Sequence, residues 1–314
     1  MMSRPGRGGE KARGAALLTA LLIVSVAVTV ITGMISAQHL DIRASGNAFE
    51  RDRGVQFALG GEAWAMGILS RDATEGGHDH LNELWAAIAP PIPVTGGTAT
   101  GRITDLQGRF NLNNLLLEGK QSPVDRARFE RLLLVVGLEP RLASAVVDWI
   151  DRDGEVSGPG GAEDETYLGK RPPYRAANQP FVSATELRLV EGFDAEALQR
   201  LLPLVTALPE RTEWNVNTAP VELLMTLVEN FSRGEAMAID DARRRDKGYV
   251  DVASFLAEPL LKGREVLSGG VGVSSRYFLV EGEVRLERGR TRLSSLLMRN
   301  NGRMTLLRRA RGPL

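Results

Sequence analysis

The chain has 314 residues, with 39 basic and 39 acidic side chains and no cysteine. That length is enough for one large domain or two modest ones with real cores. The balanced charge argues against a dominant nucleic-acid role, which needs a basic face, and the lack of cysteine excludes disulfides and thiol chemistry.

The most apolar stretch lies near the N-terminus, between Arg13 and Asp41. Its core, residues 15–37, is 23 residues long and carries no charged side chain. A helix of that length covers roughly 34 Å, enough for a hydrocarbon layer of about 30 Å. The leader before it has four basic residues and one acidic residue. Basic residues before a membrane helix hold that end in the cytoplasm, so we expect everything after Asp41 on the far side of the membrane.

Three interpretations of this stretch compete. Its length and its lack of charge disfavour a buried core helix. A cleaved secretory signal has a shorter apolar region that ends in a small-residue site. A prepilin-like signal fits better, because there the cut follows a glycine and the apolar helix stays on the mature protein. The predicted cut lies between Gly14 and Ala15, and Thr19 then stands at the fifth mature position, where most prepilins have Glu.

The helix is expected to continue into water over residues 40–73, where apolar side chains recur at roughly helical spacing between charged ones. Four glycines, at positions 46, 54, 60 and 61, are expected to weaken it and to bend it. The result would be one long helix, half in the membrane and half packed on a globular head.

The middle of the chain changes from strand-like to helical patterns. Residues 99–113 alternate and contain Gln107-Gly108, which predicts a hairpin or strand pair. Ser183 and Glu186 match a capping box, which predicts a helix start near Ser183. Apolar periodicity of helix length occurs at 126–136, 141–150, 184–190 and 195–204.

An internal repeat runs through this helical region. Phe110-Asn111-Leu112-Asn113 recurs as Trp214-Asn215-Val216-Asn217, and helices follow each copy. The second copy resembles helix-hairpin-helix modules, including those of competence DNA receptors, in which a glycine-containing hairpin lets backbone amides approach a phosphate. Residues 229–234 stand at that place without the paired glycines, and residues 191–194 in the first half are acidic and also match poorly. The fold resemblance therefore does not bring the phosphate site with it.

Acidic side chains concentrate in one loop, where seven carboxylates lie within 18 residues between Asp148 and Glu165. Left unpaired, so many like charges repel and keep a loop disordered. A hard divalent ion such as Ca²⁺, which takes roughly six to eight oxygen ligands, would relieve the repulsion. The loop is not an EF-hand, because Ala162 stands where an EF-hand has its final Glu. A solvated acidic loop without a metal is the alternative.

His78-Asp79-His80 also suggests a metal site, but the sequence shows no third ligand, so a solvated loop is favoured there.

Strand-like alternation returns from Val273. Glu287 to Arg290 predicts a hairpin turn, and residues 304–309 predict a last strand. With the long first helix, these strands would form a small α/β head. The chain has three histidines, no cysteine and no Gly-x-Ser-x-Gly motif, so we expect no enzyme.

Several phrases together resemble the K-type minor pseudopilins of bacterial type II secretion: RGAALLTALLIV, RGVQFALGGEAWAMGIL, and DWIDRDG with GAEDETY. The resemblance covers nearly the whole chain. It implies an α+β fold, a type IV pilin-like head in which a long transmembrane helix packs on a small antiparallel sheet, with a large, mostly helical insertion of helix-hairpin-helix or SAM-like type. The expected division is a leader at 1–14, a transmembrane helix at 15–37, pilin-like parts at 38–117 and 271–314, and the insertion at 118–270.

The resemblance also implies a function. The protein would be a minor pseudopilin at the tip of the periplasmic pseudopilus, where it helps to initiate assembly and so protein export across the outer membrane. Its implied partners are the I-type and J-type minor pseudopilins, the major pseudopilin and the prepilin peptidase, with no nucleic acid. It would cross the inner membrane once, with a cytoplasmic N-terminus and a periplasmic head. A membrane-anchored, helix-hairpin-helix DNA receptor of a competence system is the alternative.

The resemblance assigns site residues as well. K-type pseudopilins have calcium-bound loops, which implies calcium here, with Asp151, Asp153, Glu163 and Asp164 as ligands and Asp148 as a weaker candidate. In pilin-like filaments the fifth-position Glu meets the N-terminal amine of a neighbour, and a subunit with nothing above it does not need that carboxylate. Thr19 can bond back to a carbonyl one turn earlier and predicts a tip position, with a merely tolerated helix residue as the alternative.

Overall fold

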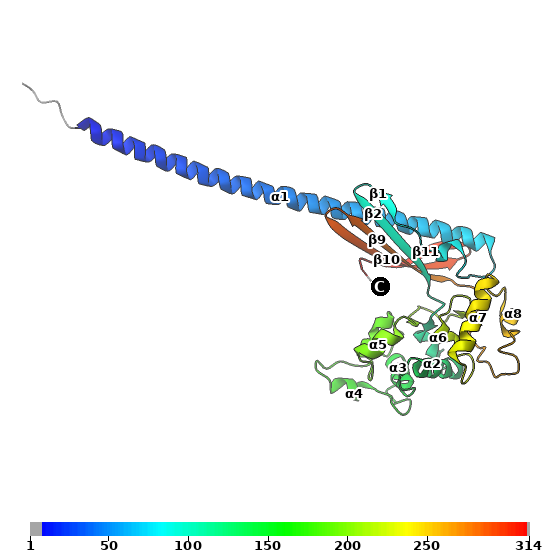
Figure 1. The fold of residues 1–314 in the computed structure, drawn as a ribbon. Coiled ribbons are helices and arrows are strands. Elements are labelled where there is room, and N and C mark those ends of the chain that lie inside the picture. The colour runs from blue at the N-terminus through cyan, green and yellow to red at the C-terminus, as the bar shows by residue number, and fades with distance from the viewer. Residues whose placement is uncertain (1–7, 313–314) are drawn as a thin grey trace, which may run out of the picture.

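The computed structural model describes residues 8–312, and the side chains of residues 16–74 and 76–312. The chain forms three layers: one long helix, an antiparallel sheet beneath the end of that helix, and a helical domain on the other side of the sheet (Figure 1). This arrangement confirms the expected fold class.

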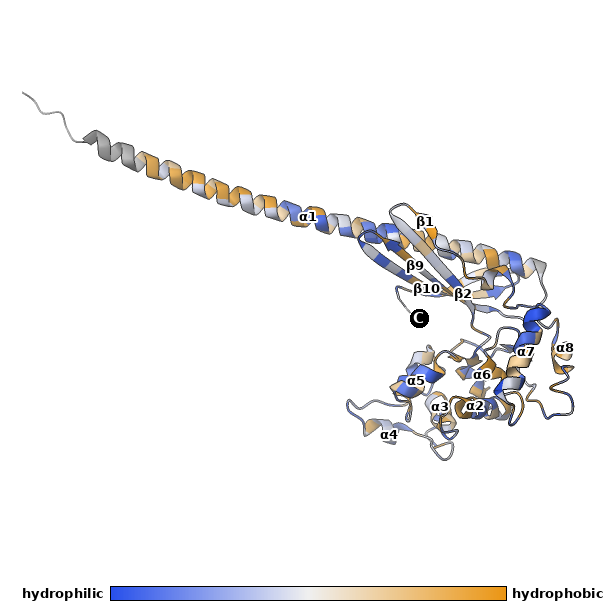
Figure 2. Ribbon diagram, in the orientation of Figure 1, coloured by the Kyte–Doolittle hydropathy of each residue, from blue (hydrophilic) through white to orange (hydrophobic). Residues whose placement is uncertain are grey.

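The long helix α1 runs without interruption from Gly8 to Glu75. Residues 16–37 of α1 are mainly apolar and all exposed, and the most apolar window of the helix has a mean hydropathy of 2.4 with none of it buried (Figure 2). Among the described residues, α1 is the one helix long and apolar enough to cross a membrane. The Thr19 hydroxyl donates to the Ala16 carbonyl at 2.9 Å, and Thr29, Thr32 and Ser36 bond back in the same way. The helix thus satisfies these hydroxyl donors internally, as a lipid environment requires.

The sheet has five antiparallel strands in the order β1-β2-β9-β10-β11. The turn predicted at Glu287 to Arg290 is confirmed, because Leu286 and Gly289 pair across a two-residue connection between β9 and β10. The predicted last strand is confirmed as β11. The strand bounds are Ile92–Val94 (β1), Gly97–Asp105 (β2), Tyr277–Leu286 (β9), Gly289–Asn300 (β10) and Arg303–Ala310 (β11).

The hairpin predicted at residues 99–113 is wrong. β2 pairs with β1 and β9, while β3 (Phe110–Asn111) leaves the sheet and pairs in parallel with β6 (Val205–Thr206). The turn between them carries the chain into the helical domain, where Gly108 packs on Thr218 so closely that a Cβ would lie 2.7 Å from its hydroxyl oxygen. Alternation predicts strands but does not show which strands pair.

The second half of α1 packs on the sheet through two apolar clusters. One contains Ala65 and Leu69 of the helix, the other Ala58. At Gly54 a Cβ would lie 2.4 Å from the Thr291 hydroxyl oxygen, so this glycine lets β10 approach the helix closely. The sheet and the segment after α1 contribute Trp85, Phe278, Val280 and Leu297 to the first cluster, and Val284, Leu286 and Leu293 to the second.

An ion pair between a buried carboxylate and an exposed arginine lies between these clusters. The Glu62 carboxylate accepts hydrogen bonds from the Ser295 hydroxyl and from Arg309 of β11, whose Nε lies 2.8 Å away. Burial alone would raise the pKa of Glu62, but the hydrogen bonds from Arg309 and Ser295 hold it below its usual value. The pair therefore ties α1 to the last strand of the chain.

The helical domain lies between β2 and β9 in the sequence and packs around a single large core. The helices predicted at 126–136, 141–150 and 195–204 are present as α2, α3 and α5. The segment at 184–190 has the expected capping box, but it forms a 3₁₀ helix, the geometry common in such short helices.

The α-helices after α1 are α2 (Pro123–Val135), α3 (Leu142–Ile150), α4 (Asp164–Leu168), α5 (Ala195–Leu201), α6 (Val221–Leu224), α7 (Arg233–Arg245) and α8 (Val252–Leu256). The 3₁₀ helices are η1 (Leu84–Ala86), η2 (Leu112–Leu115) and η3 (Ala184–Leu189), and the remaining short strands are β4 (Leu116–Leu117), β5 (Lys120–Gln121), β7 (Trp214–Asn215) and β8 (Val271–Gly272).

The asparagines of the two predicted repeat copies make matching hydrogen bonds. Asn113 clamps Phe181, with its Oδ1 accepting from the Phe181 amide at 2.8 Å and its Nδ2 donating to the Phe181 carbonyl at 3.0 Å. Asn217 clamps Tyr249 in the same way, at 2.7 and 3.0 Å. Each clamped residue stands two positions before a helix N-cap, so both asparagines hold the start of a later helix against a short parallel strand pair.

A buried carboxylate joins the helical domain to the sheet. Asp105, at the end of β2, accepts hydrogen bonds from the Gln107 amide, the Ser275 and Thr218 hydroxyls and the Asn215 side chain, at 2.5 to 3.2 Å. Burial raises the pKa of Asp105 to about 6, although the hydroxyl donors oppose that rise. Every one of these four partners donates, so the joint depends on an acceptor at this position.

Candidate metal site in the helical domain

The acidic loop connects α3 to α4 and is held by Asp148, which is buried within α3. Asp148 Oδ1 accepts from the Ser157 amide at 2.9 Å, and Oδ2 accepts from the Ala162 amide at 2.7 Å. A Cβ at Gly161 would lie 2.3 Å from the same Oδ2, so only glycine fits there. Asp148 therefore shapes the loop through its backbone amides.

Three of the five predicted ligands come together at the two ends of the loop. Asp151 follows the last residue of α3, and Glu163 is the N-cap of α4. Carboxylate oxygens of Asp151, Asp153 and Glu163 lie within 4.8 Å of one another. Asp151 is 8% exposed and Glu163 is 6% exposed, whereas Asp153 is exposed to solvent.

The buried oxygens of this group lack hydrogen-bond donors. Oδ1 of Asp151 and both carboxylate oxygens of Glu163 are buried with no partner among the described residues. Burial, reinforced by repulsion from the neighbouring carboxylates, raises the pKa of Asp151 to about 6 and that of Glu163 to about 7. Buried carboxylates without donors are costly, and a bound cation would supply the missing charge and ligation.

Asp164 is placed differently from the other four residues. Its Oδ2 accepts from Arg175 at 2.9 Å, and its Oδ1 accepts from the Ala176 amide at 3.0 Å. Both oxygens therefore have donors within the domain, and Asp164 is not in the group that Asp151, Asp153 and Glu163 form.

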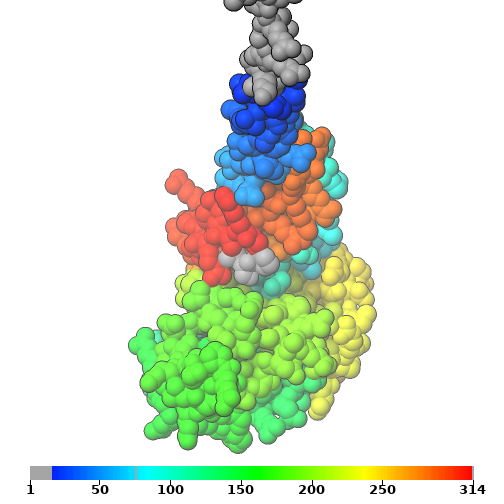
Figure 3. Space-filling model, turned by 90° about the vertical axis from the view of Figure 1, so that its left-hand side faces the viewer, coloured from blue at the N-terminus to red at the C-terminus, as the bar shows by residue number. Residues whose placement is uncertain are grey.

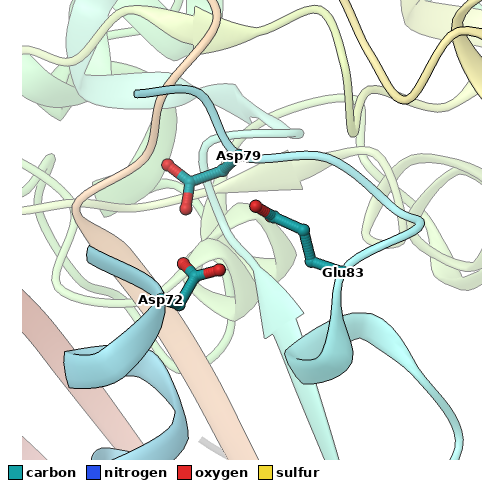
Figure 4. A group of neighbouring side chains, drawn as sticks. All are labelled: Asp72, Asp79 and Glu83. Atoms are coloured by element: carbon teal, nitrogen blue, oxygen red, sulfur yellow. The ribbon is translucent and has the colours of Figure 1, made fainter. Parts of the chain in front are cut away.

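A second acidic group was missed from the sequence. The carboxylates of Asp72, Asp79 and Glu83 point toward one another from the end of α1 and the segment that follows it (Figure 4). Arg299 lies against two of them, 2.7 Å from Asp72 and 2.6 Å from Asp79. A cation of the chain itself thus offsets part of the charge of this group. The only signal in the sequence was His78-Asp79-His80. Of these three residues, the aspartate belongs to the acidic group and the two histidines do not.

At the position of a helix-hairpin-helix phosphate site, the chain places one of its own carboxylates, that of Glu235. Ser232 caps α7, and its backbone amide donates to the Glu235 carboxylate at 2.9 Å. Arg233 is paired with Glu222 and Arg264 with Glu235. A carboxylate thus stands where a phosphate would approach, so the geometry lends no support to the DNA-receptor hypothesis.

The predicted processing site lies at the start of the described chain. Residues 1–7 of the leader lie outside the described residues. The bond between Gly14 and Ala15 lies within α1, where only the helical backbone is described. Thr19 makes the backward hydrogen bond expected for it.

Comparison with known proteins gives consistent matches. Two family models, both described as type II secretion system protein K, match residues 108–210 and 214–274. A relative from Pseudomonas aeruginosa, named type II secretion system protein K, is 39% identical over 95% of this chain and 92% of its own length. A relative of the same name from Klebsiella pneumoniae is 31% identical over 96% of this chain and 97% of its own length. A chain in the crystal structure of the GspK-GspI-GspJ complex from enterotoxigenic Escherichia coli matches with a TM-score of 0.72 and 28% identity, over 85% of this chain and 98% of that one.

The raised pKa values predict how the metal-free loop responds to pH. A carboxyl group whose pKa is higher in the folded state binds more protons folded than unfolded, so its contribution to stability falls as pH rises from about 4 to about 7. In the presence of a chelator, Glu163→Gln should therefore gain stability relative to the unchanged protein between pH 5 and pH 8, on the order of 1–2 kcal/mol. Thermal melts at both pH values measure this.

The matched control is Glu165→Gln, an exposed carboxylate of the same segment. The stability of this variant should differ from that of the unchanged protein by the same amount at pH 5 and at pH 8. A Glu163→Gln difference that does not change between pH 5 and pH 8 would show that Glu163 is not an unpaired buried acid.

Proposed function

This chain belongs to the type II secretion system protein K family and is a minor pseudopilin, and from that premise we propose that it caps the tip of a periplasmic pseudopilus and helps to start its assembly. The observation that carries this proposal is the combination of one uninterrupted anchoring helix (Figure 1) with a large helical domain beyond the sheet (Figure 3). The protein is structural, and its role in export follows from where it sits.

The proposed topology has the N-terminus in the cytoplasm and the head in the periplasm. The basic leader supports that orientation, and the apolar helix is consistent with an anchor in the inner membrane. We further propose that the prepilin peptidase cuts between Gly14 and Ala15. The helix would then stay on the mature protein, because the same helix forms one wall of the core of the head.

Thr19 supports a position at the end of the filament. A carboxylate in an apolar setting is costly unless it is paired, so a subunit with no neighbour above it is better without one. The Thr19 hydroxyl finds its acceptor one turn earlier in its own helix and leaves no polar group unsatisfied. The helical domain supports the same position, since a bulky domain is free at an end and would obstruct a further subunit stacked above it.

The proposed partners are other pseudopilins. The matching solved chain comes from a complex with GspI and GspJ, and we propose that the I-type and J-type minor pseudopilins bind this protein as well. The major pseudopilin would then extend the filament below this tip complex.

We also propose that the acidic loop binds calcium, through Asp151, Asp153 and Glu163. All three are carboxylates, the ligand type that hard cations prefer, and their oxygens lie close enough together to share one ion. Asp148 would act by holding the loop rather than by ligating through a free oxygen. Asp164 remains a ligand only if it exchanges its Arg175 contact for the ion.

Calcium should stabilise the detergent-solubilised full chain. An ion that binds only the folded protein adds about 2.7 kcal/mol when its concentration is about 100 times its dissociation constant, which raises Tm by several degrees. Asp151→Ala and Glu163→Ala should abolish the difference between melts in calcium and in EDTA, while Glu196→Ala, an exposed carboxylate of α5, should keep it. Identical melts in calcium and EDTA for the unchanged protein would mean that the loop is merely acidic.

The tip position predicts where a label appears on assembled filaments. The chain has no cysteine, so Met237→Cys, at an exposed position on α7, introduces a single attachment point for gold. Electron microscopy should find the gold at one end of each filament, with at most one cluster per filament. Gold spread along the shaft would contradict the tip role, whatever the leader sequence implies.

A further inference from the structure

A gap interrupts the side of the sheet that faces α1. Gly101 of β2 and Gly282 of β9 are directly opposite each other in the register. The neighbouring cross-strand pairs are Ala99 with Val284 on one side and Ile103 with Val280 on the other. Since Val280 and Val284 belong to the two separate apolar clusters under α1, the glycine pair lies where the core divides.

A third glycine, Gly61 of α1, faces the same gap. None of the three glycines has a positive φ, so none is needed for the backbone conformation. A Cβ at Gly61 would have nothing within 4 Å, and Cβ atoms at Gly101 and Gly282 would meet only carbonyl oxygens, at 3.6 and 3.9 Å. Glycine weakens helices and strands, so three glycines without an internal reason indicate space that is kept for another backbone.

The gap opens to solvent as an apolar groove of ≈ 300 Å³, which we call the glycine slot. Four of its wall residues are large, apolar and exposed. Trp64 of α1 is 56% exposed and Ile88 of the segment before β1 is 86% exposed, and the other two are Leu84 and Ile92. A rim of exposed apolar side chains around an apolar floor is characteristic of a protein interaction site. The other large apolar wall residues are Phe57, Ile68, Trp85, Ile103, Val280 and Val284.

We propose that the glycine slot binds an apolar helix of another pseudopilin subunit, in contact with the backbones of Gly101 and Gly282. This inference rests on the proposed assembly with other pseudopilins. Such a partner is anchored in the same membrane by its own N-terminal helix and therefore rises beside α1. The face that α1 turns toward the slot carries Phe57, Gly61, Trp64 and Ile68 at helical spacing, with the glycine allowing close approach of a second helix.

The slot can be filled without disturbing the fold. Gly61→Leu and Gly282→Val place side chains in open space, so their Tm values should not fall below that of the unchanged protein. In detergent, with the other minor pseudopilins of the same secretion system purified as probes, each variant should bind at least tenfold more weakly. Gly60→Leu is the matched control. Gly60 directly precedes Gly61 in α1, is equally open and does not line the slot, so binding by this variant should be unchanged.

The outcomes separate this inference from the function on which it rests. If the unchanged protein binds no other pseudopilin, the proposed assembly fails and the slot assignment fails with it. If the unchanged protein binds and both slot variants bind equally well with normal Tm values, the assembly stands and the slot assignment is overturned. A photo-crosslinker at Ile88 should give an adduct with the helix of another pseudopilin, and an adduct with a second copy of this chain or with lipid would also overturn the assignment.

Discussion

One helix, α1, has to be compatible with lipid in its first half and with water in its second half, and the rest of the structure depends on that constraint. Over residues 16–37, α1 exposes mainly apolar side chains, and the hydroxyls of Thr19, Thr29, Thr32 and Ser36 bond back to its own carbonyls. In its second half the same helix needs a partner surface in water, and the sheet supplies it under Ala58, Ala65 and Leu69. The ion pair of buried Glu62 with Arg309 fixes the helix to the last strand, so the anchor and the end of the chain form one unit.

The helical domain is built on a duplicated clamp and attached through a polar joint. Asn113 and Asn217 hold equivalent residues of the two copies, and Asp105 gathers four donors where the domain meets the sheet. The copies differ in what precedes the clamped residue. The second copy passes from α7 to Tyr249 in three residues, whereas the first contains the long acidic loop before Phe181. The candidate metal site therefore lies in an extension of one copy and leaves the shared framework unchanged.

Local patterns predicted the parts of the fold that local interactions determine. The uncharged apolar run, the Ser183 capping box and the turn near Arg288 all depend on residues within a few positions of one another. The pairing of β2 was predicted wrongly, because its partner β9 is about 180 residues away in the sequence and alternation does not specify a partner. The same limit applies to the sites. The loop carboxylates could be found as a cluster, but the pairing of Asp164 with Arg175, the neutralisation of Asp79 by Arg299 and the alignment of Gly101 with Gly282 appear only in the folded register.

The central claim is that the apolar half of α1 remains part of the working protein, because its second half forms one wall of the core of the head. The most direct test is the intact mass of the protein extracted from the membranes of its native host. A chain that begins at Ala15, with or without a methyl group on its amine, is the result expected from cleavage after Gly14. A mature chain that lacks residues 15–37 would contradict the account, since the head would then have been separated from the helix that anchors it.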